Sequence, residues 1–191
     1  PEQSRRDNGC RPKRHSITTA GRQPPAGKPA LSPIAPQPQG EIMRPKTSYP
    51  VHRTKKLLFA ITPKSENVKT GDMEQLYIMP ADEPPHEAIK AGRDTVTCGN
   101  CPLIGKAAGG TGECYVVTVQ GPREVWEKTH NAPLIDIEPA KKPIRLGAYG
   151  EPVFAPFRLI KRLLANGRRW TGYTHQWREK DTPAKWSRYL M

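Results

Sequence analysis

The last third of the chain carries a strand–helix–strand pattern that restricts the possible folds. Residues 143–152, PIRLGAYGEP, are typical of a strand that runs into a glycine-rich turn. Residues 155–169 repeat apolar side chains at helical spacing and stop at an Asn-Gly pair. Residues 169–177, RWTGYTHQW, have the aromatic and β-branched content of a second strand. Such a unit favours parallel pairing with a right-handed crossover, so chemistry is expected at the carboxyl ends of its strands. Those ends are Ala148-Tyr149-Gly150-Glu151 and Thr174-His175-Gln176, which include Glu151 and His175.

Other segments of the chain are also expected to be ordered. Residues 57–61 and 75–79 are short apolar runs typical of buried strands, and residues 114–119 have strand composition as well. Residues 86–92 predict a short helix with a glycine cap, and residues 121–131 a helix with proline in its first turn. Together these elements predict an α/β domain with a small mixed or parallel sheet and βα units, for which a partial barrel is one form of closure.

The amino-terminal segment, residues 1–50, differs in composition from the rest. Prolines recur every few residues, and no aromatic residue occurs before Tyr49. Up to Lys56 the chain carries 12 Lys and Arg against 3 Asp and Glu, whereas the remainder carries 19 against 15. This composition predicts a disordered, basic, proline-rich tail ahead of a domain over residues 51–191. The tail either contacts nucleic acid or is a solvated linker, and a third interpretation makes it an upstream read-through with Met43 as the natural start.

Residues 98–114 read CGNCPLIGKAAGGTGEC and carry three of the four cysteines. The C-x2-C spacing lets Cys98 and Cys101 point at one ion from a tight turn, and Cys114 can return from the far side of a glycine-rich loop. Four interpretations remain open: a zinc ion, an iron–sulfur cluster, a redox disulfide between Cys98 and Cys101, or no chemical role. A cluster held by three cysteines would leave one iron open, and an open iron can bind S-adenosylmethionine.

A metal site with three cysteines needs a further ligand. The candidates are His86, His130 and His175, of which His175 is the best placed because it follows a strand. Glu151, at the neighbouring strand end, is a candidate ligand or, with His175, a candidate acid–base pair. The alternative for Glu151 is a turn carboxylate in solvent.

Basic and aromatic residues are interleaved towards the carboxyl end of the chain. No acidic residue occurs between Arg158 and Arg178. Cations contact phosphates and aromatic rings stack on bases, so the region is a candidate nucleic-acid interface. The alternative is that the aromatic residues pack into the core and the helix presents an ordinary basic face to water. The candidate nucleic-acid residues are Arg158, Lys161, Arg162, Arg168 and Arg169, while Lys69 and Arg145 are candidates for holding an anionic substrate or cofactor.

Several motifs occur together in a fixed order. They are Ser65, Asn67, Lys69, Thr70 and Gly71; the three cysteines with Tyr115; Gly150-Glu151-Pro152; and Tyr173-Thr174-His175. Together they resemble a family of phage and mobile-element proteins of unknown function, the mycobacteriophage "gene product 88" type, some of whose members are labelled rolling-circle replication proteins. The resemblance covers roughly residues 57–177 and implies a phage or mobile-element protein. More distantly, an early cysteine loop followed by βα units is similar to radical S-adenosylmethionine enzymes, although their C-x3-C-x2-C differs from C-x2-C-x12-C here.

Three functions therefore remain open at the level of sequence. The first is a metal-dependent or iron–sulfur enzyme of a phage, the second a zinc-stabilised nucleic-acid-binding protein linked to phage or plasmid replication, and the third an inert fragment. The chain ends at WSRYLM, where a new strand is expected, so a truncated reading frame is one interpretation. Because no apolar run is long enough to span a membrane and no signal-peptide core is present, we expect a cytoplasmic protein without a membrane partner. The sequence leaves the oligomeric state open.

Overall fold

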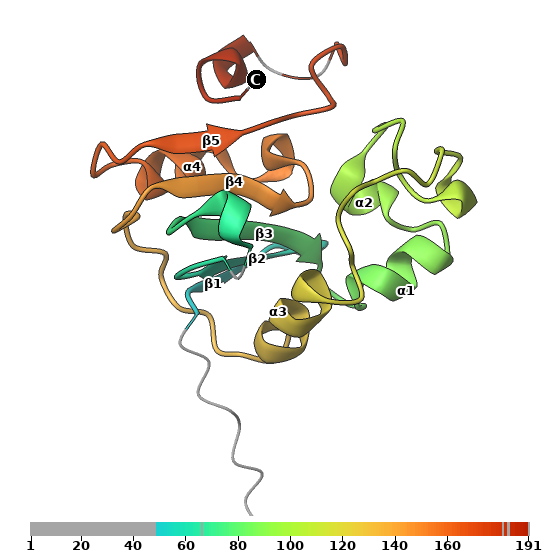
Figure 1. The fold of residues 1–191 in the computed structure, drawn as a ribbon, viewed down its shortest axis with the longest axis horizontal. Coiled ribbons are helices and arrows are strands. Elements are labelled where there is room, and N and C mark those ends of the chain that lie inside the picture. Colours follow the sequence, from blue (N-terminus) through green and yellow to red (C-terminus); the bar gives the residue numbers. More distant parts are fainter. Residues whose placement is uncertain (1–48, 66, 181, 183, 191) are drawn as a thin grey trace, which may run out of the picture. The chain divides into compact units, whose positions relative to one another are not determined.

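The structure is a computed structural model that describes residues 49–65, 67–180, 182 and 184–190 (Figure 1). Its centre is a five-stranded sheet made of β1 (Val51–Arg53), β2 (Leu57–Thr62), β3 (Glu74–Pro80), β4 (Ile144–Tyr149) and β5 (Trp170–Gly172), hydrogen-bonded in chain order. The first three strands pair antiparallel and the last three parallel, which confirms the mixed α/β sheet. Within the described residues β1 and β5 form the two edges and do not pair with each other, so a partial barrel is not confirmed.

Short helices connect the strands. No helix among the described residues is long and apolar enough to cross a membrane. The tail predicted for residues 1–50, with its Met43 start, lies outside the described residues except for the last two positions. The helices are α1 (Pro85–Lys90), α2 (Thr95–Cys98), α3 (Gly121–Thr129) and α4 (Phe157–Leu163), and the 3-10 turns are η1 (Val68–Thr70), η2 (Lys106–Ala108), η3 (Pro152–Phe154) and η4 (Ala184–Arg188).

The predicted strand–helix–strand unit is present as β4, α4 and β5. β4 and β5 pair in parallel, with Ile144 opposite Trp170. β5 is shorter than predicted, because its pairing ends at Gly172 instead of continuing to Trp177. The backbone N–H of His175 donates to the Glu151 carboxylate, so the chain turns towards that side chain and leaves the strand.

Both faces of the sheet are covered by apolar side chains. All six residues of β2 are buried, as expected for a strand with a packed layer on each face. One layer joins alternate strand residues to α4 and η4, where Ile160, Leu163 and Trp186 are buried. The opposite layer includes Trp126 of α3, whose indole Nε1 donates to the carbonyl of Pro80 at 2.9 Å. The carboxyl ends of β4 and β5 emerge between these layers.

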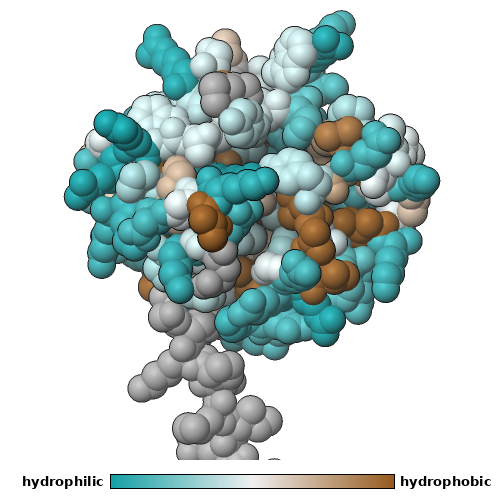
Figure 2. All heavy atoms as spheres, in the orientation of Figure 1, coloured by the Kyte–Doolittle hydropathy of each residue, from teal (hydrophilic) through white to brown (hydrophobic). Residues whose placement is uncertain are grey.

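Residues 114–119 do not form the strand that their composition predicts. No strand or bridge is assigned to this segment, which connects the cysteine loop to α3. Its side chains Tyr115, Val117 and Val119 are exposed, and Figure 2 shows hydrophobic side chains gathered over this part of the molecule. Strand propensity reflects how well side chains pack beside a neighbouring strand. Both edges of β3 are already hydrogen-bonded, to β2 and to β4, so the segment has no place beside it. The prediction was wrong because composition alone supplies no pairing partner.

Candidate metal centre

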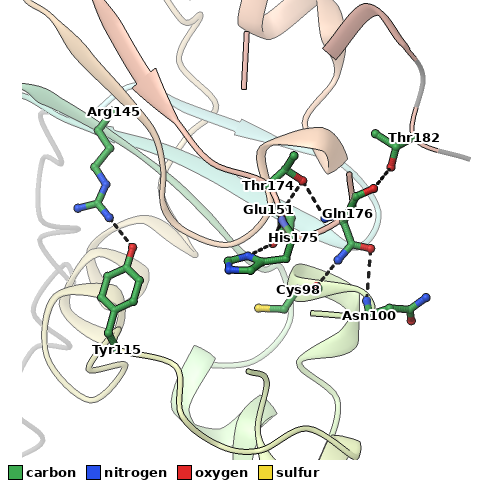
Figure 3. A network of polar contacts seen from close by, with 9 residues as sticks. All are labelled: Cys98, Asn100, Tyr115, Arg145, Glu151, Thr174, His175, Gln176 and Thr182. Carbon is green, nitrogen blue, oxygen red and sulfur yellow. Dashed lines mark hydrogen bonds and ion pairs between the residues drawn. The ribbon is translucent and has the colours of Figure 1, made fainter. Parts of the chain in front are cut away.

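The two strand ends that the sequence singled out meet in the structure. Glu151 follows β4 and is only 4% exposed, so the alternative of a solvated turn carboxylate is wrong. Its Oε1 lies 2.7 Å from Nδ1 of His175, and its Oε2 accepts a hydrogen bond from the Thr174 hydroxyl at 2.8 Å (Figure 3). The backbone N–H of His175 also donates to both carboxylate oxygens, at 3.1 and 3.2 Å. Glu151 therefore fixes both the backbone and the imidazole of His175.

The residue after His175 attaches the cysteine turn to the sheet. Nε2 of Gln176 donates to the carbonyl of Cys98 at 3.0 Å, and its Oε1 accepts from the backbone N–H of Asn100 at 3.4 Å (Figure 3). A side chain at Gly99 would approach the Gln176 amide oxygen to 2.7 Å, and Gly99 has a φ of +56°. A bare backbone is thus needed for the turn to reach Gln176.

A second glycine brings the end of β4 close to α2. Gly150 has a φ of +81°, and a Cβ at this position would collide with the Ile78 carbonyl and lie 2.7 Å from Cγ2 of Thr97. Next to it, the backbone N–H of Glu151 donates to the carbonyl of Thr97 at 3.0 Å. The cysteine turn therefore packs directly against the ends of β3 and β4.

These contacts bring three different donor types together. One ligand atom each from Cys101, Glu151 and His175 lies within 4.8 Å of the other two. Cys101 is buried, while the imidazole of His175 is 43% exposed. Cys98 and Cys114 are not members of this group, but both thiols are close enough for their charges to influence Cys101 or each other. The sequence named all five residues, and the structure brings the donor atoms of Cys101, Glu151 and His175 together.

The Cys98 and Cys101 thiols are poor nucleophiles in the absence of a cation, because burial raises the pKa of both. Burial raises the pKa of the Cys98 thiol, and the negative charge of Asp94 raises it further. Burial also raises the pKa of the Cys101 thiol, with a smaller contribution from Glu151. Reactive cysteines and redox pairs require a lowered pKa, so this environment disfavours the redox disulfide. A bound cation would act in the opposite direction, because it displaces the thiol protons.

The surroundings are short of positive charge. The only charged partner of the Glu151 carboxylate within the described residues is His175. Asp94 is 1% exposed, and although its Oδ2 accepts from the Gly105 N–H at 3.0 Å, its Oδ1 has no partner. The buried hydroxyl of Tyr149 also lacks a partner; burial, and then the Cys98 charge, raise its pKa. A buried centre with several anionic groups is chemically suited to a cation.

The other histidines considered as ligands lie outside this centre. The ring of His130 stacks on Trp126 at 3.9 Å between centroids, and its Nδ1 contacts the Trp126 carbonyl. His86 lies on α1, where its Nε2 is 3.9 Å from a Glu87 carboxylate oxygen. Neither belongs to the group of convergent donors in the described part of the chain.

The two candidate anion-binding residues are separate from the donor group. Arg145 donates to the Tyr115 hydroxyl at 2.7 Å, away from Glu151 in Figure 3. Lys69 is exposed on η1. The described residues show no hydrogen bond or ion pair that links either cation to Cys101, Glu151 or His175.

The basic region has an arrangement that neither sequence interpretation described fully. Arg162 donates to the Ile137 carbonyl at 2.7 Å and to Glu138, whereas Arg158, Lys161, Arg168 and Arg169 are exposed. The idea that the aromatic residues pack into the core is wrong, because Trp170, Tyr173 and Trp177 are 41%, 55% and 63% exposed. Thr174 and Gln176 occupy the buried positions between them, where their polar groups serve the candidate centre.

Sequence reasoning placed Tyr149, Thr174 and Gln176 at the two strand ends without giving them a role, and it did not single out Asp94. The alternation of polar and aromatic residues in TGYTHQW was a signal for Thr174 and Gln176. The alternative considered for this segment placed the aromatic residues on the buried face, where the structure places Thr174 and Gln176. Comparison of the chain with protein-family models, curated proteins and solved structures finds no match. The resemblance to phage proteins therefore stays a prediction.

Proposed function

We propose that this protein binds a single transition-metal ion, with zinc as the best fit, between the cysteine loop and the carboxyl ends of β4 and β5. The observation that carries the proposal is the convergence of Cys101, Glu151 and His175 donor atoms within 4.8 Å. Donors held at zinc–ligand distances in a tetrahedron are about 3.3–3.8 Å apart. A small inward movement of the Cys101 and His175 side chains would bring their donor atoms to such a distance.

The hydrogen bonds support a specific division of roles. Metal-binding histidines commonly donate their second ring N–H to a carboxylate, which fixes the tautomer. The 2.7 Å contact between His175 Nδ1 and Glu151 has this form and leaves His175 Nε2 available for the ion. In the proposal Cys98, Cys101, Cys114 and His175 are the four ligands, and Glu151 is the carboxylate that orients His175.

The donor set favours one ion over an iron–sulfur cluster. Clusters are usually held by cysteine thiolates. Here an imidazole and a carboxylate, instead of further thiols, have donor atoms within 4.8 Å of the Cys101 sulfur. Sulfur and imidazole donors in a tetrahedral arrangement suit zinc. The proposal therefore does not extend to an open iron or to S-adenosylmethionine.

The ion would have a structural role in the cysteine loop. Between α1 and α3 the loop contains only α2, of four residues, and the three-residue turn η2. Such a segment buries little apolar surface of its own, and metal binding supplies folding free energy in comparable cases. We propose that zinc fixes this loop to the sheet, with His175 as the ligand from the sheet side.

Metal analysis of the full chain tests this function. We expect about one zinc per chain, with little iron and no acid-labile sulfide. Cys101→Ser and His175→Ala should each lose the zinc, whereas Cys10→Ser and His52→Ala are matched controls that should retain it. Zinc-free protein, or zinc that survives both ligand substitutions, would refute the proposal. Iron with equal sulfide would replace it with a cluster.

A further inference from the structure

A second site candidate lies on the opposite side of α4 from the sheet. A pocket of about 510 Å³ is lined by Phe157 and Lys161 of α4 and by Lys185, Arg188 and Tyr189 of the carboxyl-terminal segment. Its volume is within the range of small-molecule sites in proteins. We call it the η4 pocket.

The local folding of two short elements explains this composition. In α4, Ile160 is fully buried against the sheet, which leaves Lys161 on the outer side. In η4, Trp186 is 3% exposed and meets the edge of the Phe157 ring, with centroids 5.2 Å apart. Lys185 and Arg188 are consequently directed outward, and the two elements contribute their cations to one pocket.

Within the described residues, no acidic side chain compensates the charge of the pocket. Its described lining contains no carboxylate, and none of the ion pairs in the described residues involves Lys161, Lys185 or Arg188. Nζ of Lys185 lies 4.5 Å from the centroid of the Phe157 ring. Three cations facing one cavity repel each other, and a bound anion would relieve that repulsion.

Aromatic rings lie beside these cations. Trp170 of β5 is 41% exposed, and its Nε1 donates to the Tyr189 carbonyl at 3.1 Å. The rings of Trp170 and Tyr189 have centroids 6.1 Å apart. Figure 1 shows the carboxyl-terminal segment next to β5, which carries Trp170. The exposed indole of Trp170, next to Tyr189 of the pocket lining, offers a flat surface to a base whose phosphate is held in the pocket.

We propose that the η4 pocket binds nucleotides, with Lys161, Lys185 and Arg188 on the phosphate and Trp170 and Tyr189 against the base. The same chemistry is presented by a free nucleotide and by a single-stranded nucleic acid. The site is independent of the proposed metal centre, because none of its residues is a candidate ligand. Arg168 and Arg169, which immediately precede Trp170 in the sequence, are also exposed.

The test uses a fluorescein-labelled oligothymidylate of about 12 nucleotides, followed by anisotropy over a series of salt concentrations. Thymidine triphosphate, inorganic triphosphate and polyglutamate are the competitors. Lys161→Ala/Arg188→Ala removes two pocket cations. Lys55→Ala/Lys90→Ala removes two exposed cations on other elements and is the matched control. All proteins keep the basic amino-terminal segment, so its contribution cancels, and unfolding midpoints confirm that each variant is folded.

We expect the pocket variant to bind about tenfold more weakly, and the control to stay within about twofold of the unchanged protein. Loss of two single-strand phosphate contacts should reduce the salt slope by about 1.4, at about 0.7 per contact. Trp170→Ala should weaken binding at least about fivefold, because a base stack is lost. Competition by thymidine triphosphate would assign a free nucleotide as the ligand, and competition only by an unlabelled strand would assign nucleic acid.

Three results would overturn the proposal. They are absence of binding by the unchanged protein at low salt, equal weakening of the pocket variant and the control, and competition by polyglutamate as strong as that by oligothymidylate. The last two would mean a general attraction of anions to a basic protein. If the double variant does not fold, Arg188→Gln alone is compared with Lys90→Gln by the same criteria.

Discussion

Replacement of Glu151 by Gln tests how the candidate centre orients its histidine. The carboxylate accepts hydrogen bonds from the Thr174 hydroxyl, the His175 backbone and His175 Nδ1. An amide cannot accept all three. If its NH₂ group faces Nδ1, the ring must accept there and carry its proton on Nε2, which removes the lone pair that zinc needs. If its oxygen faces Nδ1, the NH₂ group meets the Thr174 and backbone donors.

Either orientation of the amide should weaken zinc binding. Loss of such an orienting partner typically costs about 10–100-fold in metal affinity, or about 1.4–2.7 kcal/mol. The assay is a competition titration of zinc against a chromophoric chelator. Glu179→Gln is the control, since Glu179 is an exposed carboxylate close to His175 in sequence. A zinc affinity of Glu151→Gln within about twofold of the unchanged protein would refute the assigned role.

Three further predictions concern stability. Gly150→Ala and Gly167→Ala both place a side chain at positive φ, which costs about 1–2 kcal/mol in each case. Only the new methyl group at position 150 would collide with backbone, at the Ile78 carbonyl. Urea unfolding should therefore show Gly150→Ala to be about 1–3 kcal/mol more destabilising than Gly167→Ala. Gln176→Leu leaves the Cys98 carbonyl without its side-chain donor and should lower the free energy of unfolding by about 1–3 kcal/mol. A thiol reagent should also modify Cys98 faster in this variant, and an unchanged rate of modification would contradict the assigned contact. In the metal-free protein burial raises the pKa of the Cys98 and Cys101 thiols above the ordinary 9.0, so the folded state keeps protons that the unfolded state releases. This contribution to the stability of the metal-free protein is therefore present below pH 9.0 and is lost as the pH rises further. With zinc bound, stability should instead rise with pH between about pH 6 and pH 8, because zinc binding releases thiol protons. Urea unfolding midpoints measured over both pH ranges, with and without zinc, give both slopes.

The strand ends were predictable from sequence because local patterns define them. Apolar runs, glycine-rich turns and helical spacing located β2, β3, β4, α3 and α4, and the parallel unit then required Glu151 and His175 to lie at one edge of the sheet. Their contact needs no long-range information beyond that topology. This part of the candidate centre follows from the general rule for parallel strands.

The remainder of the centre depends on contacts that no local pattern specifies. Thr174 and Gln176 could as well have been surface residues of a strand whose aromatic neighbours were buried. The structure reverses this arrangement, because the Glu151 carboxylate and the Cys98 carbonyl lie on the inner side and need donors. The strand predicted over 114–119 fails for a related reason, since its composition fits a sheet that has no vacant neighbour beside β3.

Three consecutive residues after β5 connect the parts of this candidate site. Thr174 holds the Glu151 carboxylate, His175 approaches Cys101, and Gln176 holds the backbone of the cysteine turn. A one-residue slip of this segment would move all three contacts together, because their side chains alternate between the inner and outer sides. The segment that follows β5 thus determines the position of the cysteine loop as well as that of the histidine. For this reason we expect zinc release to loosen the loop from the β5 end, and Gln176→Leu to weaken zinc binding although it is no ligand.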